Sequence, residues 1–262
     1  MNNPNVYAAI QCGGMEFFMN RTVLITGASR GIGRAAALKF AHEGYQCVIT
    51  CLRSTDRLVQ VQSEIEAMGV PCLSFTGDIG NFEDCERLFG EIHSRFGHID
   101  VLVNNAGIAW IGLFQDMSPS EWDRMMHTNL YSVYNTCQQA VPSMVSQHSG
   151  RIINVSSVWG ISGASCEVAY SAAKGAVNSF TKALAKELAP SNIQVNAVAF
   201  GCVDTEMNSE LLDGDALHEL EEEIPAGRLA TADEAGEFIY HIATAGSYLT
   251  GQIIPFTGGW IV

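Results

Sequence analysis

Three side chains in the second half of the sequence could carry acid–base chemistry on a carbonyl group. Tyr170 and Lys174 stand at positions i and i+4, which places both on one face of a helix. A free phenol has a pKa of about 10, too high for efficient acid–base catalysis at neutral pH. A neighbouring ammonium group would stabilise the phenolate and lower that pKa. Ser157 ends an apolar run upstream, where its hydroxyl could hold the substrate oxygen beside Tyr170.

Reduction of a carbonyl group also needs a hydride donor. A glycine-rich turn near the start of the chain could bind a dinucleotide that supplies the hydride. The apolar run 22–26 leads directly into Thr26-Gly27-Ala28-Ser29-Arg30-Gly31-Ile32-Gly33. Glycines let the backbone turn sharply and approach a pyrophosphate, and the following helix offers free N–H groups to the phosphates. Because the turn follows a strand and opens a helix, it predicts dinucleotide binding. The residues expected to take part are Gly27, Ser29, Arg30, Gly31, Ile32 and Gly33.

The segment after the second apolar run indicates which dinucleotide is bound. NAD-selective folds usually end this strand with an acid that bonds the ribose 2′-hydroxyl, but residues 47–55 contain no Asp or Glu. They contain Arg53 and Ser54, and Arg30 stands in the glycine-rich turn. Because arginine favours a 2′-phosphate, we expect NADP(H). The alternative is that Arg53 is only a solvated loop charge.

Apolar runs that must position these groups alternate with amphipathic stretches. The pattern predicts strands at 22–26, 46–51, 70–75, 99–105, 151–157, 192–200 and 252–256. It predicts helices at 31–43, 56–69, 82–96, 119–147, 169–189 and 232–245. Strands that are apolar on both faces and separated by helices are typical of parallel sheets. We therefore expect the α/β class: a single-domain, Rossmann-type, doubly wound parallel sheet of about seven strands with helices on both faces.

Composition narrows the possible partners and compartments. The chain has 262 residues, 47% of them hydrophobic, and a formal net charge of −14. That charge disfavours nucleic acids and anionic membranes, and no apolar run is long enough to span a bilayer. The eight cysteines form no CxxC pair, and the histidines show no metal-binding spacing. We expect no metal, reduced thiols and a cytoplasmic protein.

The chain is predicted to consist of one domain preceded by a short N-terminal segment. Residues 21–262 form the predicted domain. Residues 1–20 lack the basic start and apolar middle of a signal peptide. We expect them to be a loose tail, or an over-long start with Met15 or Met19 as the true one.

Residues 21–262 resemble the short-chain dehydrogenase/reductase family, most closely its bacterial 3-oxoacyl-acyl-carrier-protein reductase branch. Besides the glycine-rich turn, the matching motifs are Asp78, Asn104-Asn105-Ala106-Gly107, Ser157, Tyr170-Ser171-Ala172-Ala173-Lys174 and Thr250-Gly251-Gln252. The resemblance implies that Tyr170 is the acid/base, that Lys174 modifies its pKa and binds ribose, and that Ser157 polarises the carbonyl. It implies that Asn129 kinks its helix and anchors a proton-relay water. Further implied cofactor contacts are Asp78, Ile79, Asn105, Ala106, Gly107, Gly201, Val203 and Thr205.

The sequence departs from the family after the sixth strand, where Phe200-Gly201 replaces the common Pro-Gly. Since proline fixes φ, its loss is expected to loosen this turn and to bring a ring near the nicotinamide. Residues 204–223 carry nine acids and no Lys or Arg, namely Asp204, Glu206, Glu210, Asp213, Asp215, Glu219, Glu221, Glu222 and Glu223. Such charge would disfavour an acidic carrier and attract cations, unless these acids merely form a solvated helix face. The expected substrate-pocket residues are Trp110, Trp159, Glu167 and Met207.

These features predict an NADPH-dependent ketone reductase with two competing substrate classes. One is a 3-oxoacyl thioester. The other is a cationic aminoketone, since the segment 157–168 resembles a subgroup that includes reductases of the 5-aminopentanone group on elongation factor P. A non-catalytic NADP-sensing protein on the same fold is the alternative from another class. The resemblance also implies a homotetramer or homodimer built through 119–147 and 169–189.

Overall fold

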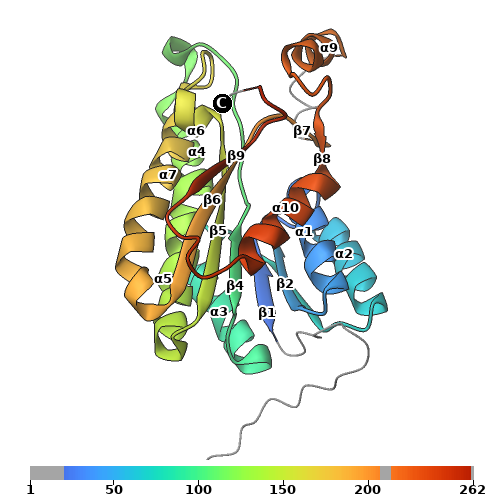
Figure 1. The fold of residues 1–262 in the computed structure, drawn as a ribbon, viewed down its shortest axis with the longest axis vertical. Coiled ribbons are helices and arrows are strands. Elements are labelled where there is room, and N and C mark those ends of the chain that lie inside the picture. Colours follow the sequence, from blue (N-terminus) through green and yellow to red (C-terminus); the bar gives the residue numbers. More distant parts are fainter. Residues whose placement is uncertain (1–20, 207–213, 261–262) are drawn as a thin grey trace, which may run out of the picture.

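A seven-stranded parallel sheet forms the centre of the molecule in a computed structural model that describes residues 21–206 and 214–260 (Figure 1). Its order is β3-β2-β1-β4-β5-β6-β9. The strands are β1 (Thr22–Ile25), β2 (Gln46–Cys51), β3 (Cys72–Thr76), β4 (Val101–Asn104), β5 (Gly150–Ser157), β6 (Ile193–Phe200) and β9 (Ile253–Phe256). The order reverses between β1 and β4, and doubly wound sheets bind ligands at the carboxyl ends of the strands beside such a point.

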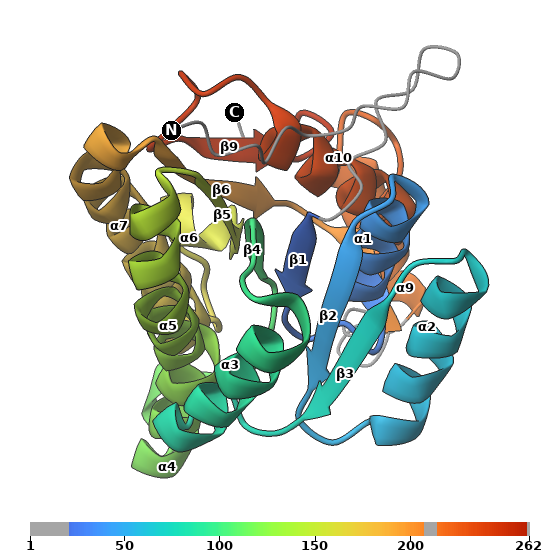
Figure 2. The same ribbon diagram turned by 90° about the horizontal axis from the view of Figure 1, so that it is seen from below.

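Two layers of helices cover the sheet (Figure 2). One face carries α1 (Gly31–His42), α2 (Thr55–Ala67) and α10 (Ala232–Thr244), and the other carries α3 (Phe82–Phe96), α5 (Ser132–Gln147) and α7 (Val168–Leu188). Each layer of helices packs against the sheet and forms a separate hydrophobic core. One core includes Phe40 and Ile49, and the other includes Leu102 and Met144. The predicted α/β fold with helices on both faces is confirmed.

Most predicted elements agree with the structure to within one or two residues, but the expected helix at 119–147 is divided. It consists of α4 (Pro119–Met126), a π-helical turn at His127–Tyr131, and α5. A capping box between Ser118 and Glu121 starts α4, and such boxes satisfy the free N–H groups of a first turn. Asn129 lies at the centre of the π turn.

Several short elements follow the sheet strands and were not predicted. They are α6 (Trp159–Ser162), the two-strand pair β7 (Val203–Asp204) and β8 (Ala230–Thr231), and α9 (Gly214–Glu223). Three 3-10 or π turns complete the described chain, at Phe114–Asp116, His127–Tyr131 and Ala189–Ser191. The cysteines of the described residues are free thiols. No helix in residues 21–206 or 214–260 is long and apolar enough to cross a membrane.

Candidate active site

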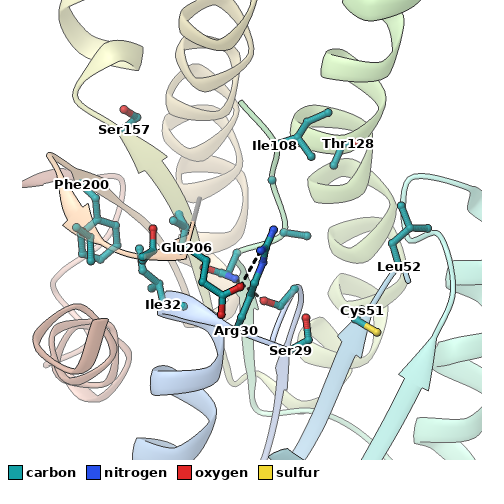
Figure 3. A pocket seen from close by; sticks show the side chains of 18 of the residues that line it. Ser29, Arg30, Ile32, Cys51, Leu52, Ile108, Thr128, Ser157, Phe200 and Glu206 are labelled. Atoms are coloured by element: carbon teal, nitrogen blue, oxygen red, sulfur yellow. Dashed lines mark hydrogen bonds and ion pairs between the residues drawn. The ribbon is translucent and has the colours of Figure 1, made fainter. Parts of the chain in front are cut away.

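A cleft of about 390 Å³ opens at the carboxyl ends of β1, β2, β4, β5 and β6 (Figure 3). The structure brings most of the predicted site residues together there. These are Gly27, Ser29, Arg30, Gly31, Ile32, Arg53, Ser54, Asn105, Ala106, Gly107, Ser157, Tyr170, Lys174, Gly201, Val203 and Thr205. The cleft therefore extends from the glycine-rich turn and the end of β2 to the Tyr170 side chain.

The glycine-rich turn needs its glycines for two different reasons. Gly27 and Gly31 have positive φ angles of 66° and 55°, a region that side chains disfavour. Gly33 has an ordinary φ, but a Cβ there would lie 2.4 Å from the Gly27 carbonyl oxygen. Gly33 does not line the cleft. Because Gly33 has no side chain, the first turn of α1 can pack directly against the Gly27 loop.

The loop after β4 is tied to this turn. The Asn105 side-chain amide donates to the carbonyl oxygens of Thr26 and Gly27 at 2.9 and 3.1 Å. The Thr26 hydroxyl accepts from the backbone N–H groups of Asn105 and Ala106 at 2.9 and 3.0 Å. These bonds fix the β1 and β4 loops relative to one another, at the reversal of strand order.

The opposite end of the cleft holds the three groups proposed for acid–base chemistry. Ser157 is the last residue of β5, and its oxygen accepts from the Trp159 N–H at 3.1 Å and forms a hydrogen bond with Tyr170. The Lys174 ammonium donates to the Val155 carbonyl at 2.8 Å. Its nitrogen lies 5.6 Å from the centre of the Tyr170 ring. The serine and the tyrosine thus converge on one point, with the lysine behind them.

The electrostatics of this end differ from the sequence expectation. Burial raises the pKa of Tyr170 to about 12, and the Ser157 hydrogen bond opposes the rise only in part. Burial also lowers the pKa of Lys174 to about 8. The expected net lowering of the Tyr170 pKa by Lys174 is therefore not found, because removal from water disfavours the phenolate more than its neighbours favour it. In this structure Tyr170 is protonated at neutral pH and has a proton to donate.

Asn129 occupies the centre of the π turn and is fully buried. Its amide nitrogen donates to the carbonyls of Ile108 and Met125 at 3.0 and 3.1 Å, and its oxygen accepts from the Ile108 N–H at 3.2 Å. A Cβ on Gly107 would lie 2.7 Å from that oxygen and 3.6 Å from the Lys174 nitrogen. The side chain thus joins the irregular helix to the loop after β4, close to Lys174.

Two neighbouring serines, Ser156 and Ser157, end β5, and Ser156 is hydrogen-bonded to α7. Its hydroxyl donates to the Asn178 amide oxygen at 2.6 Å, and the Asn178 nitrogen donates to the Gly160 carbonyl at 2.9 Å. A Cβ on Gly160 would lie 2.7 Å from the Lys174 carbonyl carbon, so α6 and α7 meet closely there. Ser156 also lines the cleft, but its hydroxyl is occupied by Asn178, so Ser157 is the serine that meets Tyr170.

Besides Gly33 and Asn129, five predicted site residues with described positions do not line this cleft. The Asp78 carboxylate lies 3.0 Å from the His127 ring nitrogen, and Ile79 is buried in the core. Trp110 donates to Glu121 at 3.1 Å, and the Trp159 ring packs edge-on against Trp260 at 5.0 Å. Glu167 precedes α7, where burial raises its pKa against a hydrogen bond from Trp159. Met207 lies outside the described residues.

The backbone of the turn at Phe200 is hydrogen-bonded on both sides, and its loosening by the loss of proline stays a prediction. The Gly201 N–H donates to the Phe256 carbonyl at 2.9 Å, and the Val158 N–H donates to the Phe200 carbonyl at 3.0 Å. The Phe200 ring packs edge-on against Phe256 at 5.6 Å and lines the cleft. The Phe256 ring is therefore the packing partner of the side chain that stands in place of proline.

The cleft also contains residues that the sequence did not single out. They are Cys51, Leu52, Ile108, Arg124, Thr128, Val155 and Ser156. Glu206, which the sequence offered only as one of the acids of residues 204–223, lines the cleft as well. Cys51 and Leu52 could have been found, because they end β2 or follow it directly. Thr128 and Arg124 could not, since only the packing of α4 and the π turn brings them to the cleft.

The residues present fit a dinucleotide. A Cβ on Gly27 would lie 2.9 Å from the Ala106 Cα, so the backbone approaches the loop in a way that only glycine permits. Arg53 and Ser54 follow β2, the strand after which this fold recognises the ribose 2′ position, and Arg30 lines the same cleft. For metals, the described part of the chain contains no cluster of three or more His, Cys, Asp or Glu side chains that could hold an ion.

Comparison with known proteins defines the class. Residues 21–216 match the family model for short chain dehydrogenases. The chain belongs to the short-chain dehydrogenase/reductase family, and the resemblance seen in the sequence is confirmed.

Among individual proteins, the chain is 39% identical over 242 residues to the 3-oxoacyl-[acyl-carrier-protein] reductase FabG of Staphylococcus epidermidis, covering 92% of this chain and 99% of the relative. The FabG of Staphylococcus aureus is 38% identical over the same length, covering 92% of this chain and 98% of that protein. An uncharacterized oxidoreductase of Bacillus subtilis, YmfI, is 39% identical over 244 residues, covering 92% and 99%. With these relatives, the protein is an oxidoreductase that acts on CH–OH or C=O groups and belongs to a family that uses a nicotinamide cofactor.

Proposed function

We propose that the protein reduces a ketone to a secondary alcohol with NADPH, with Tyr170 as the proton donor. The observation that carries this is the convergence of the Ser157 oxygen and the Tyr170 hydroxyl in the cleft, with the Lys174 nitrogen 5.6 Å from the phenol ring. A bound reduced nicotinamide would supply the hydride. The preference for NADPH is supported by Arg30 in the glycine-rich turn, by Arg53 just after β2, and by the lack of Asp or Glu in residues 47–55.

The chain's own groups would divide the proton chemistry among them. The Ser157 hydroxyl would donate a hydrogen bond to the carbonyl oxygen and hold it beside Tyr170. As the oxygen becomes basic, Tyr170 would transfer its phenolic proton to it. The Lys174 ammonium would stabilise the phenolate that remains, since its pKa of about 8 keeps it mostly charged at neutral pH. The buried Asn129 would hold the loop at Gly107 beside Lys174.

The leading substrate class is a 3-oxoacyl thioester, because FabG relatives match over nearly their whole length. A cationic aminoketone, such as the 5-aminopentanone group on elongation factor P, is the second candidate. The acids of residues 204–223 favour it, since Asp204, Glu219, Glu222 and Glu223 are exposed and this stretch contains no Lys or Arg. Near a substrate entrance they would attract a cation and repel an acidic carrier protein.

The test is NADPH oxidation, followed by absorbance, with acetoacetyl thioesters, simple ketones and an aminoketone. We expect the highest kcat/KM with either the thioester or the aminoketone, and a lower kcat/KM with NADH than with NADPH. Addition of salt separates the two substrate classes, because screening weakens long-range attraction of a cation. Binding of NADPH without oxidation in the presence of any of these substrates would support the non-catalytic alternative instead.

A further inference from the structure

Two arginines at the nucleotide end of the cleft converge on one carboxylate. Arg30, in the glycine-rich turn, donates to Glu206 Oε2 at 3.0 Å (Figure 3). Arg57, in the first turn of α2, donates to the same oxygen. Glu206 follows β7, so the chain brings it from 149 residues away to reach Arg57. A carboxylate from the far end of the domain thus bridges two cations beside the glycine-rich turn.

The two ion pairs of Glu206 lie at the nucleotide end of the cleft, where they can affect cofactor binding. The end of β2 is where folds of this type recognise the ribose 2′ position, and Arg57 begins the helix that follows it. Arg30 and Glu206 both line the cleft, together with Arg53 and Ser54 from the β2–α2 connection. Two guanidinium groups in this position suit a phosphate. Here the anion between them is Glu206.

The ion pairs of Glu206 with Arg30 and Arg57 are charged but exposed, so a phosphate could displace the carboxylate. The hydrogen bonds from Arg57 and Arg30 lower the pKa of Glu206, so the carboxylate is charged throughout the neutral range. About half of each side chain is exposed, with 39% for Arg30, 51% for Arg57 and 49% for Glu206. Ion pairs this exposed are individually weak, whereas a phosphate carries more charge and more acceptor oxygens than a carboxylate.

We propose that Glu206 is a specificity-determining residue, whose carboxylate competes with the 2′-phosphate of the cofactor for Arg30 and Arg57. The inference rests on the proposed function in that the ligand is a nicotinamide dinucleotide. NADPH must displace Glu206 from the two arginines, whereas NADH has only a 2′-hydroxyl, which a carboxylate can accept. Glu206 thereby reduces the ratio of the NADPH affinity to the NADH affinity that the two arginines would otherwise give.

The experiment measures dissociation constants for NADPH, NADH, adenosine 2′,5′-bisphosphate and ADP in the full chain. The two nicotinamide cofactors are followed by their own fluorescence, and the two adenosine nucleotides by competition. Glu206→Gln should tighten NADPH and adenosine 2′,5′-bisphosphate about three- to tenfold. The dissociation constants of NADH and ADP should change less than about twofold or increase, because these ligands carry no 2′-phosphate for the two arginines.

A matched control removes a carboxylate from a similar ion pair outside the cleft. Glu64 of α2 pairs with Arg34 of α1 at 2.6 Å, and both side chains are about as exposed as those of the bridge. Glu64→Gln changes the net charge equally, so any general effect of charge on an anionic ligand appears there too. In the double variant Glu206→Gln/Arg57→Gln, the gain in NADPH affinity should disappear.

The outcomes separate the two proposals. Equal changes for NADPH and NADH in Glu206→Gln, an equal gain in Glu64→Gln, or weaker NADPH binding would each overturn the role of Glu206. A wild-type preference for NADH would overturn the NADPH assignment alone. In that case a selective gain for NADPH in Glu206→Gln would still support the competition. Failure of all four probes to bind would overturn both.

Discussion

At the Tyr170 end of the cleft the ionisable groups are buried or half-buried, whereas at the Arg30 end they face solvent. Burial moves the pKa of Tyr170 to about 12 and that of Lys174 to about 8. At the exposed end the pKa of Glu206 is lowered instead, and the cause is direct hydrogen bonding to Arg57 and Arg30. Removal from water produces large shifts that surface pairs in high dielectric do not. The buried end is therefore suited to proton transfer, and the exposed end to selection between similar ligands.

The largest expected effect comes from removing the acid at the buried end. Tyr170→Phe should lower kcat by about 10²- to 10⁴-fold, the range attributed to a positioned acid. The phenyl ring keeps the shape of the site, so the dissociation constant of NADPH should change little. Stopped-flow or steady-state NADPH oxidation, combined with a binding titration, measures both quantities. A variant that retains wild-type turnover would eliminate Tyr170 as the proton donor.

The pH dependence of turnover tests the charge on Lys174. Because burial lowers the folded-state pKa of Lys174 to about 8, the ammonium is present below that pH and is lost above it. The kcat for ketone reduction should therefore fall above pH 8, by up to about tenfold per pH unit. Lys174→Met should give a low rate without this dependence. A wild-type rate that is constant from pH 7 to pH 10 would contradict the role of the charge.

The network behind the buried end should also contribute to stability. Asn178→Ala removes the partner of the buried Ser156 hydroxyl and of the Gly160 carbonyl. Leaving such groups unpaired costs about 1–3 kcal/mol, so the free energy of unfolding in urea should decrease by about that amount. The double variant with Ser156→Ala should lose less than the sum of the two single variants, since one change removes the group that the other leaves unpaired. Additive losses would argue against the network.

The smallest effect is expected at the exposed end. Arg53→Ala should raise the KM for NADPH about three- to tenfold, because it removes one partly solvated charge from the 2′-phosphate site. The KM for NADH should stay within about twofold of the wild-type value. Arg95→Ala, on the last turn of α3 outside the cleft, is the matched loss of charge. Equal effects of Arg53→Ala on both cofactors would show that Arg53 is only a solvated loop charge.

Prediction from sequence was most accurate where a regular pattern and a motif coincide. The seven strands were located because apolar runs between helices are typical of buried parallel strands, and the glycine-rich turn, Ser157, Tyr170 and Lys174 do line one cleft. The predictions for Trp110, Trp159 and Glu167 had only residue type to support them. In the structure the two tryptophans are engaged with Glu121 and Trp260, outside the cleft.

The sequence by itself determined the alternation of strands and helices, the glycines of the nucleotide turn and the i,i+4 spacing of Tyr170 and Lys174. These depend on local geometry, which neighbouring residues dictate. Only the tertiary structure decided that burial, and not the lysine, dominates the pKa of Tyr170, and that Asn129 lies in a π turn. It alone decided that Glu206 meets Arg30 and Arg57. Each of these depends on groups far apart in the chain, whose distances and exposure to water are set when the layers pack.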